Sequence, residues 1–231
     1  MKTLRESLLD IDSVQSGLEP ASLINEWRKE NIKGTYKIDP KTLDIDSNGD
    51  IEIVNKDITE LPNFIHFGRI DGCYDCSDCE KLTSLRGCPK IVGRNFNCAT
   101  CNSLISLKGA PEKVGGYFTC SYCNSLQSLE GVAEEVDMHF DCSYCKNLTT
   151  LKGAPKKVHG GFNCSNCASL TSLKGAPEKV GGMFDCSHCQ NLTSLKGAPK
   201  NVGKVFWCMG CGTKFKEDEV KKICKAKEIY V

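Results

Sequence analysis

The chain has 231 residues, and its 30 lysines and arginines against 29 aspartates and glutamates leave a formal net charge of +1. This balance argues against a protein that binds nucleic acid through an overall basic field. No run of about 18 apolar residues occurs, so we expect no membrane-spanning helix. The N-terminus lacks the apolar stretch of a secretory signal, which predicts a cytoplasmic protein. The unusual feature is the count of 17 cysteines.

Residues 1–54 predict a cap for the structure that follows. A helix is expected from about residue 20, with Trp27 in its apolar face. The alternating segment 42–54 carries Asn48-Gly49 at its centre and predicts a β-hairpin with a type I′ turn. Residues 55–69 predict a degenerate rung without cysteine.

Seven CxxC pairs recur at a spacing of 22 residues, without an insertion, so the chain contains an internal repeat. An aromatic residue lies two positions before each pair, an aliphatic residue lies six positions before it, and two leucines follow most pairs. The pairs are Cys76/Cys79, Cys98/Cys101, Cys120/Cys123, Cys142/Cys145, Cys164/Cys167, Cys186/Cys189 and Cys208/Cys211.

One unit reads V-G-G-x-F-x-C-S-x-C-x-x-L-x-S-L-K-G-A-P. The F-x-C part alternates as a short strand does, V-G-G is typical of a turn before it, and the leucine part with its Gly and Pro predicts an irregular return. One unit cannot bury its own apolar face, so the units must stack. We expect a mainly β repeat protein: a solenoid over 55–211 with seven 22-residue units, an α+β cap at 1–54, and a short helix and strand at 212–231.

The unit resembles a leucine-rich repeat, with the second cysteine at the Asn/Cys position that closes the turn. The phrase LTSLKGAPEKVGG and the ending CGTKFKEDEVKKICKAKEIYV are similar to cysteine-rich repeat proteins of bacteriophages and prophages, most of which have no known function. The resemblance implies a viral or mobile-element source and, for this chain, a bacterial host cytoplasm.

Three interpretations of the cysteines stay open. Buried free thiols suit the strand and turn positions of the repeat. Pairs on neighbouring rungs could instead offer four thiolates to zinc, and Cys208, Cys211 and Cys224 are the candidate ligands near the C-terminus. Disulfides are disfavoured in a cytoplasmic protein. We therefore expect no cofactor, with zinc as the alternative.

The four histidines share no spacing with an acid and a nucleophile that a catalytic site would need, so we expect no enzyme. Solenoids usually bind partners through an extended concave face, and the outward strand positions vary here while the core positions do not. The aromatic residues among them are of the kind enriched in binding hot spots. The candidate partner-binding residues are Tyr117, Thr119, Tyr122, His139, Asp141, Tyr144, Asn163, Asn166, Asp185, His188 and Trp207.

The sequence thus predicts a non-catalytic module that binds a host protein through its concave strand face, with modulation of host defence as a conceivable purpose. The alternative is a zinc-binding or nucleic-acid-associated repeat protein, for which a basic row follows the leucines at Arg86, Lys108, Lys152, Lys174 and Lys196, with Glu130 interrupting. Nucleic acid is the less expected partner, no membrane is expected, and the chain is predicted to be a monomer or a weak homo-oligomer.

Overall fold

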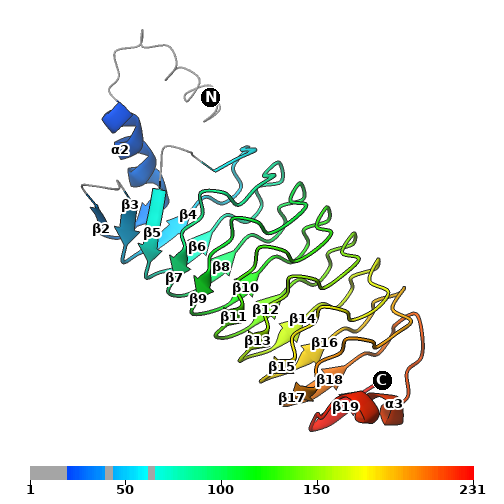
Figure 1. The fold of residues 1–231 in the computed structure, drawn as a ribbon. Helices are drawn as coiled ribbons and strands as arrows, with labels where there is room; N and C mark the ends of the chain where they lie inside the picture. Colours follow the sequence, from blue (N-terminus) through cyan, green and yellow to red (C-terminus); the bar gives the residue numbers. More distant parts are fainter. Residues whose placement is uncertain (1–19, 40–43, 62–65) are drawn as a thin grey trace.

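The computed structural model describes residues 20–39, 44–61 and 66–231, with side chains of the first helix described from residue 26 onward. The chain winds into a stack of similar turns with small elements at both ends, as Figure 1 shows. The predicted mainly β repeat solenoid with a 22-residue period is therefore confirmed.

Each turn contributes two short strands, and these build two sheets that run along the stack. We call the sheet that contains the phenylalanines the Phe sheet. Its order is β1 (Ile32–Lys33), β4 (Asp50–Glu52), β6 (Tyr74–Asp75), β8 (Phe96–Asn97), β10 (Phe118–Thr119), β12 (Phe140–Asp141), β14 (Phe162–Asn163), β16 (Phe184–Asp185), β18 (Val205–Trp207) and β19 (Glu228–Tyr230).

The second sheet, which we call the Val sheet, has nine strands. Its order is β17 (Asn201–Val202), β15 (Lys179–Val180), β13 (Lys157–Val158), β11 (Glu135–Val136), β9 (Lys113–Val114), β7 (Ile91–Val92), β5 (His66–Ile70), β3 (Asp44–Ser47) and β2 (Tyr36–Ile38). The prediction of one strand per unit was therefore incomplete, because the residues around each valine also pair from turn to turn.

The constant 22-residue step makes each position pair with its own equivalent. Phe118 pairs with Phe140 in the Phe sheet, and Val158 pairs with Val180 in the Val sheet, both in parallel. The V-G-G segment forms the corner between the two strands of a turn. Glycine is needed there because successive turns nearly touch: a Cβ atom on Gly181 would lie 2.0 Å from the carbonyl oxygen of His159.

The core consists of ladders of identical side chains between the two sheets. The phenylalanines, both cysteines of most pairs and nearly all the repeat leucines are fully buried. Phe118 and Phe140 have ring centroids 5.2 Å apart at 25°, and Phe162 and Phe184 have centroids 5.5 Å apart at 9°. Offset stacking at such distances adds about 0.5–1.5 kcal/mol per pair beyond the burial of apolar area.

The predicted hairpin at 42–54 is wrong. Strands β3 and β4 do not pair with each other: β3 joins β5 in the Val sheet and β4 joins β6 in the Phe sheet, both in parallel. Asn48-Gly49 is the corner between them, so residues 44–61 form a first turn without cysteine that begins earlier than the predicted rung at 55–69. The alternation of segment 42–54 fits either arrangement, and only the pairing partners distinguish them.

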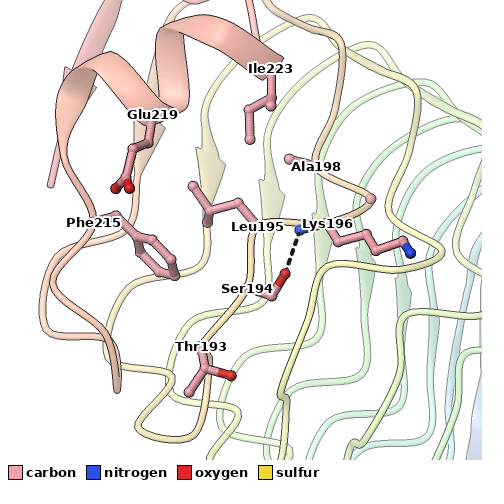
Figure 2. A pocket seen from close by; sticks show the side chains of 9 residues that line it. Thr193, Ser194, Leu195, Lys196, Ala198, Phe215, Glu219 and Ile223 are labelled. Atoms are coloured by element: carbon pink, nitrogen blue, oxygen red, sulfur yellow. Dashed lines mark hydrogen bonds between the residues drawn. The ribbon is translucent and has the colours of Figure 1, made fainter.

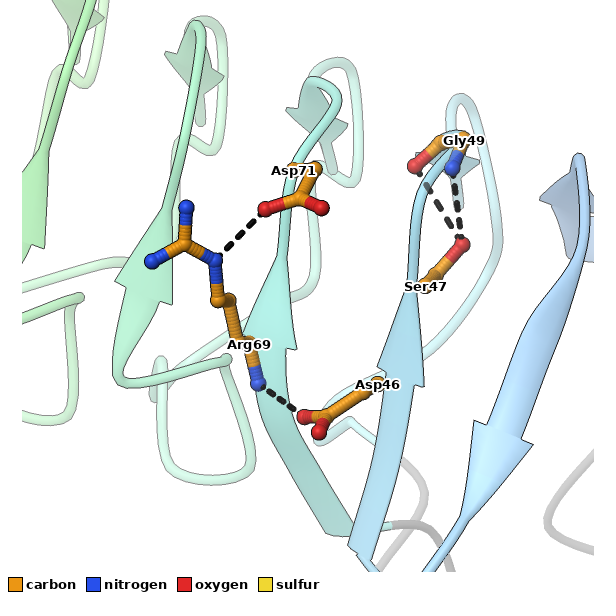
Figure 3. A network of polar contacts seen from close by, with 5 residues as sticks. All are labelled: Asp46, Ser47, Gly49, Arg69 and Asp71. Atoms are coloured by element: carbon orange, nitrogen blue, oxygen red, sulfur yellow. Dashed lines mark hydrogen bonds and ion pairs between the residues drawn. The ribbon is translucent and has the colours of Figure 1, made fainter.

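Polar contacts fasten this first turn to the next one, as Figure 3 shows. The Arg69 backbone N–H donates to Oδ1 of Asp46 at 2.6 Å, and its side-chain Nε donates to Asp71 at 2.5 Å. The Ser47 hydroxyl both accepts the Gly49 N–H at 3.1 Å and donates to the Gly49 carbonyl. The corner thus holds its shape through side-chain contacts in place of the repeated Gly-Gly.

Two antiparallel strands and a helix close the N-terminal end. Strand β1 pairs with β4, and β2 pairs with β3. Helix α2 (Pro20–Asn31) confirms the predicted helix, and its Trp27 is buried with its ring centroid 5.9 Å from that of Phe67. Residues 1–19 of the predicted cap lie outside the described residues.

The C-terminal end is closed by α3 (Glu217–Ile223) and β19, as predicted. The apolar pattern of residues 216–226 predicts that Val220, Ile223 and Cys224 face inward; Val220 and Cys224 are buried, but Ile223 is 43% exposed, which corrects the prediction for that residue. The reason is that α3 ends at Ile223 and the backbone of Cys224 is extended, so the three side chains do not share one helical face. Strand β19 runs parallel to β18 and adds a last rung to the Phe sheet.

Candidate partner-binding surface

The outward side chains of the Phe sheet form three rows along the solenoid. Counted from the first cysteine of each pair, they lie three positions before it, one before it and two after it; we call them together the Phe-sheet surface. All eleven candidate residues lie on it. Tyr117, Tyr122, His139, Tyr144, His188 and Trp207 are exposed, and Thr119, Asp141, Asn163, Asn166 and Asp185 are half-buried.

Four aromatic rings gather on the two neighbouring turns that carry β10 and β12. Tyr117 stacks on His139 with centroids 5.0 Å apart at 12°, and Tyr122 stacks on Tyr144 with centroids 4.5 Å apart at 5°. We call these four residues the aromatic patch. The pairing follows from the repeat, because equivalent residues on adjacent rungs face the same way about 4.8 Å apart.

A second exposed aromatic pair lies at the C-terminal end. Trp207 pairs in register with Tyr230, and their ring centroids are 5.4 Å apart. Tyr230 was missed as a candidate residue. The strand predicted within residues 212–231 was the available signal, but its partner strand could not be known from the sequence.

The row two positions after the first cysteine has a left-handed backbone throughout. The φ angles of Thr100, Tyr122, Tyr144 and His188 are +61°, +60°, +59° and +56°. Such a backbone costs a non-glycine residue about 1–2 kcal/mol, and glycine or asparagine relieve that cost. Gly210 occupies the equivalent position of the last unit at +68°. Tyrosine in this row is therefore unfavourable for the backbone.

The row one position before the first cysteine has a local structural role. Oδ1 of Asp141 accepts the backbone N–H of Ser143 at 2.9 Å, and Asn163 and Asp185 accept from the serines two residues on in the same way. These are Asx turns, which begin the sharp corner at C-S-x-C. The sequence reasoning missed this role, although the recurrent Asp or Asn two residues before serine was its signal.

His139 also has a structural contact. Its Nδ1 accepts the backbone N–H of Gly161 on the next turn at 2.9 Å, so this nitrogen carries no proton. Oδ1 of Asn95 accepts the N–H of Tyr117 in the same manner at 3.0 Å. Both side chains therefore connect neighbouring turns through the row three positions before the cysteine.

The cysteines form hydrogen bonds between turns. The second cysteine of a pair donates its thiol to the carbonyl oxygen of the first cysteine on the preceding turn, at 3.2 Å for Cys101 to Cys76 and for Cys167 to Cys142. In the first complete unit Cys79 donates to Ile53 at 3.0 Å. A thiol must keep its proton to donate, so this geometry supports the buried-thiol interpretation. All 17 cysteines are free in the structure.

Burial keeps most of these thiols protonated. Desolvation is the largest cause that raises the pKa of Cys167 to about 12, and it likewise raises the pKa of Cys142 and Cys164 well above the usual range. In Cys211, a hydrogen bond from Cys186 lowers the pKa at the less buried end of the ladder. The raised pKa values favour the neutral thiol in most of the ladder, whereas the shift at Cys211 favours the thiolate.

The three candidate zinc ligands do not come together. Cys208 and Cys224 are buried and Cys211 is half-buried, and within the described ranges no group of three or more His, Cys, Asp or Glu side chains has an arrangement that could hold a metal ion. Cys211 instead donates to the carbonyl oxygen of Cys186 at 3.2 Å.

The basic row predicted after the leucines lies along the return segments. Its interrupting residue, Glu130, forms an ion pair with Lys152 at 2.7 Å. That contact lowers the pKa of the Glu130 carboxyl and raises the pKa of the Lys152 amine. The row is therefore not a continuous line of cations, which weakens it as a track for phosphates.

An open pocket lies between the return segment 193–198 and the C-terminal cap, as Figure 2 shows. Leu195, Phe215 and Ile223 supply its apolar part, and Lys196 and Glu219 are its charged residues. The Lys196 backbone N–H donates to the Ser194 hydroxyl at 3.2 Å. Neither a histidine nor a cysteine is among the residues that line this pocket.

The fold and this surface define a class: a mainly β solenoid repeat protein, rich in cysteine, with a ladder core and an outward aromatic face. No protein-family model, curated protein or solved structure matches the chain. Within the described part of the chain, no helix has the length and apolar character needed to cross a membrane.

Proposed function

We propose that this protein is a non-catalytic binding module that holds a protein partner on the Phe-sheet surface, with the aromatic patch at the centre of contact. In line with the resemblance to bacteriophage and prophage repeat proteins, we propose a host protein as the partner and modulation of host defence as the purpose. We also propose that the units are leucine-rich repeats.

The observation that carries this proposal is the position of Tyr122 and Tyr144. Both tyrosines occupy a left-handed backbone that asparagine or glycine would adopt at lower cost, and they are 47% and 39% exposed. Neither burial nor backbone preference therefore accounts for them. Backbone strain of this kind concentrates at functional sites, and exposed tyrosines are the usual anchors of protein interfaces.

Affinity capture from a lysate of the natural host tests the proposal. Wild-type protein is compared with Tyr122→Asn/Tyr144→Asn, which removes both rings and suits the left-handed backbone. Lys174→Asn/Lys196→Asn is the matched control on the basic row. Each capture is made with and without nuclease.

We expect a protein that is retained by wild type and by the lysine control, is lost by the tyrosine variant, and is indifferent to nuclease. Capture that disappears with nuclease and with the lysine variant but survives loss of both tyrosines would refute the proposal. It would favour the nucleic-acid alternative.

A further inference from the structure

Charge is distributed unevenly around the solenoid. From residue 73 to residue 210, the three rows of the Phe-sheet surface contain no lysine or arginine, and their charged members are Asp75, Asp78, Asp141 and Asp185. The end strands continue the pattern with Asp50 and Glu52 in β4 and Glu228 in β19, next to a single base, Lys33 of β1, which lies 3.9 Å from Glu52.

The other surfaces carry the basic residues. The outward positions of the Val sheet hold Lys37, Arg69, Lys113, Lys157 and Lys179 against Asp44, Asp46 and Glu135, and the return segments hold the five bases of the basic row against Glu130. The formal net charge of +1 therefore conceals an acidic face and a basic remainder. A partner at the Phe-sheet surface therefore meets carboxylates and, in the three rows between residues 73 and 210, no lysine or arginine.

We infer that the partner presents arginine side chains to the Phe-sheet surface, so that guanidinium groups stack on the aromatic patch and pair with the aspartates beside it. This inference rests on the proposed function and adds the chemistry of the partner. Arginine meets both features at once, because its planar cation packs on tyrosine faces and forms paired hydrogen bonds with carboxylates.

Asp141 shows how the two features meet. It lies on β12, in register with Thr119 of β10, on the two turns that carry the aromatic patch. Its Oδ1 accepts the N–H of Ser143, and its Oδ2 has no hydrogen-bond partner among the described residues. A guanidinium that enters between the aromatic rows therefore finds a carboxylate oxygen there. An acidic partner would meet like charge at Asp75, Asp78, Asp141 and Asp185.

The probe is a short fluorescein-labelled peptide of alternating arginine and serine, with lysine/serine and glutamate/serine peptides as comparisons, measured by fluorescence anisotropy. We expect the arginine peptide to bind, the lysine peptide to bind several-fold more weakly because ammonium stacks less well, and the glutamate peptide not to bind. Added salt should weaken binding of the arginine peptide.

Two variants locate the contact. Tyr122→Asn/Tyr144→Asn should weaken the arginine peptide about tenfold. Asp141→Asn/Asp185→Asn keeps the Asx turns, since Asn163 already accepts the same N–H of its serine, and should weaken the peptide about fivefold. Lys174→Asn/Lys196→Asn should not weaken it. Equal binding of the arginine and glutamate peptides, or binding unchanged by the first two variants, would overturn the inference.

Capture of the natural partner by the same variants distinguishes failure of this inference from failure of the proposed function. A partner that is lost by the tyrosine variant but fully retained by Asp141→Asn/Asp185→Asn, together with no binding of the arginine peptide, would refute the arginine inference and leave the proposed function standing. A partner that the tyrosine variant still retains would refute the proposed function itself.

Discussion

Raising the pH is expected to unfold this protein before its lysines titrate, because the folded core holds its cysteines as neutral thiols. Thirteen cysteines have a pKa above the ordinary value of 9.0, and burial contributes to every one of these shifts; for Cys79 and Cys208 the values are about 11 and about 12. In the unfolded chain the same thiols ionise near pH 9.

The sign follows from proton binding. Between the unfolded and the folded pKa the native state binds more protons, so the free energy of unfolding falls as the pH rises; the contribution is fully present below about pH 9. One pH unit above the unfolded pKa, each such thiol has lost about 1.4 kcal/mol. Thirteen thiols that titrate independently would lose about 18 kcal/mol at pH 10, against a typical total stability of about 5–15 kcal/mol.

The assay is urea unfolding followed by circular dichroism at a series of pH values from 7 to 10, with a reductant present so that oxidation does not contribute. We expect the unfolding midpoint to fall steeply above about pH 8.5. The variant Cys142→Ala should reduce that slope by up to about 1.4 kcal/mol per pH unit, because it removes one titrating thiol. A midpoint that stays constant from pH 7 to pH 10 would refute the reasoning.

Three single substitutions test the backbone and the core, each by the urea midpoint at pH 7. Thr100→Asn should stabilise the protein by about 0.5–1 kcal/mol, since asparagine tolerates the left-handed backbone that threonine resists; a loss of stability would contradict this. Gly153→Ala should cost more than about 2 kcal/mol, because φ is +89° and a Cβ atom would lie 2.5 Å from the backbone nitrogen of Glu130, whereas the neighbouring control Lys152→Ala should change little. Tyr74→Phe should stabilise the protein by about 1 kcal/mol, because the buried Tyr74 hydroxyl meets only the weakly polar Cys88 thiol and no nitrogen or oxygen partner among the described residues; a loss of stability would contradict this.

Much of the candidate surface follows from the repeat itself. The 22-residue spacing puts equivalent residues on adjacent rungs, so the stacking of Tyr122 on Tyr144 is a direct consequence of their equal position in successive units. The local role of the Asx residues could also have been predicted from Asp or Asn two residues before serine. The left-handed backbone of the tyrosines is indicated only by Asn166 and Gly210 at the equivalent position of other units, because tyrosine itself rarely adopts it.

The interpretation of segment 42–54 failed for a different reason. Alternation and Asn48-Gly49 describe local preferences, and these did not decide the turn: neither residue has the positive φ that a type I′ hairpin turn needs. The pairing of these strands involves residues far apart in the sequence: β3 pairs with β5 and β4 pairs with β6. A hairpin is the usual outcome when two isolated strands meet, but here an existing stack offers each strand a parallel edge.

The 22-residue pattern was enough to predict the period, the members of each ladder and the capped ends, because a repeat that cannot bury its own apolar face must stack in register. Only the three-dimensional structure shows that each turn contributes to two sheets, that Tyr230 lies beside Trp207, and that acidic and basic residues lie on different faces. These features depend on the path of the backbone around each turn. That path is set by backbone angles and by contacts between neighbouring turns, which cannot be predicted from the sequence of one unit.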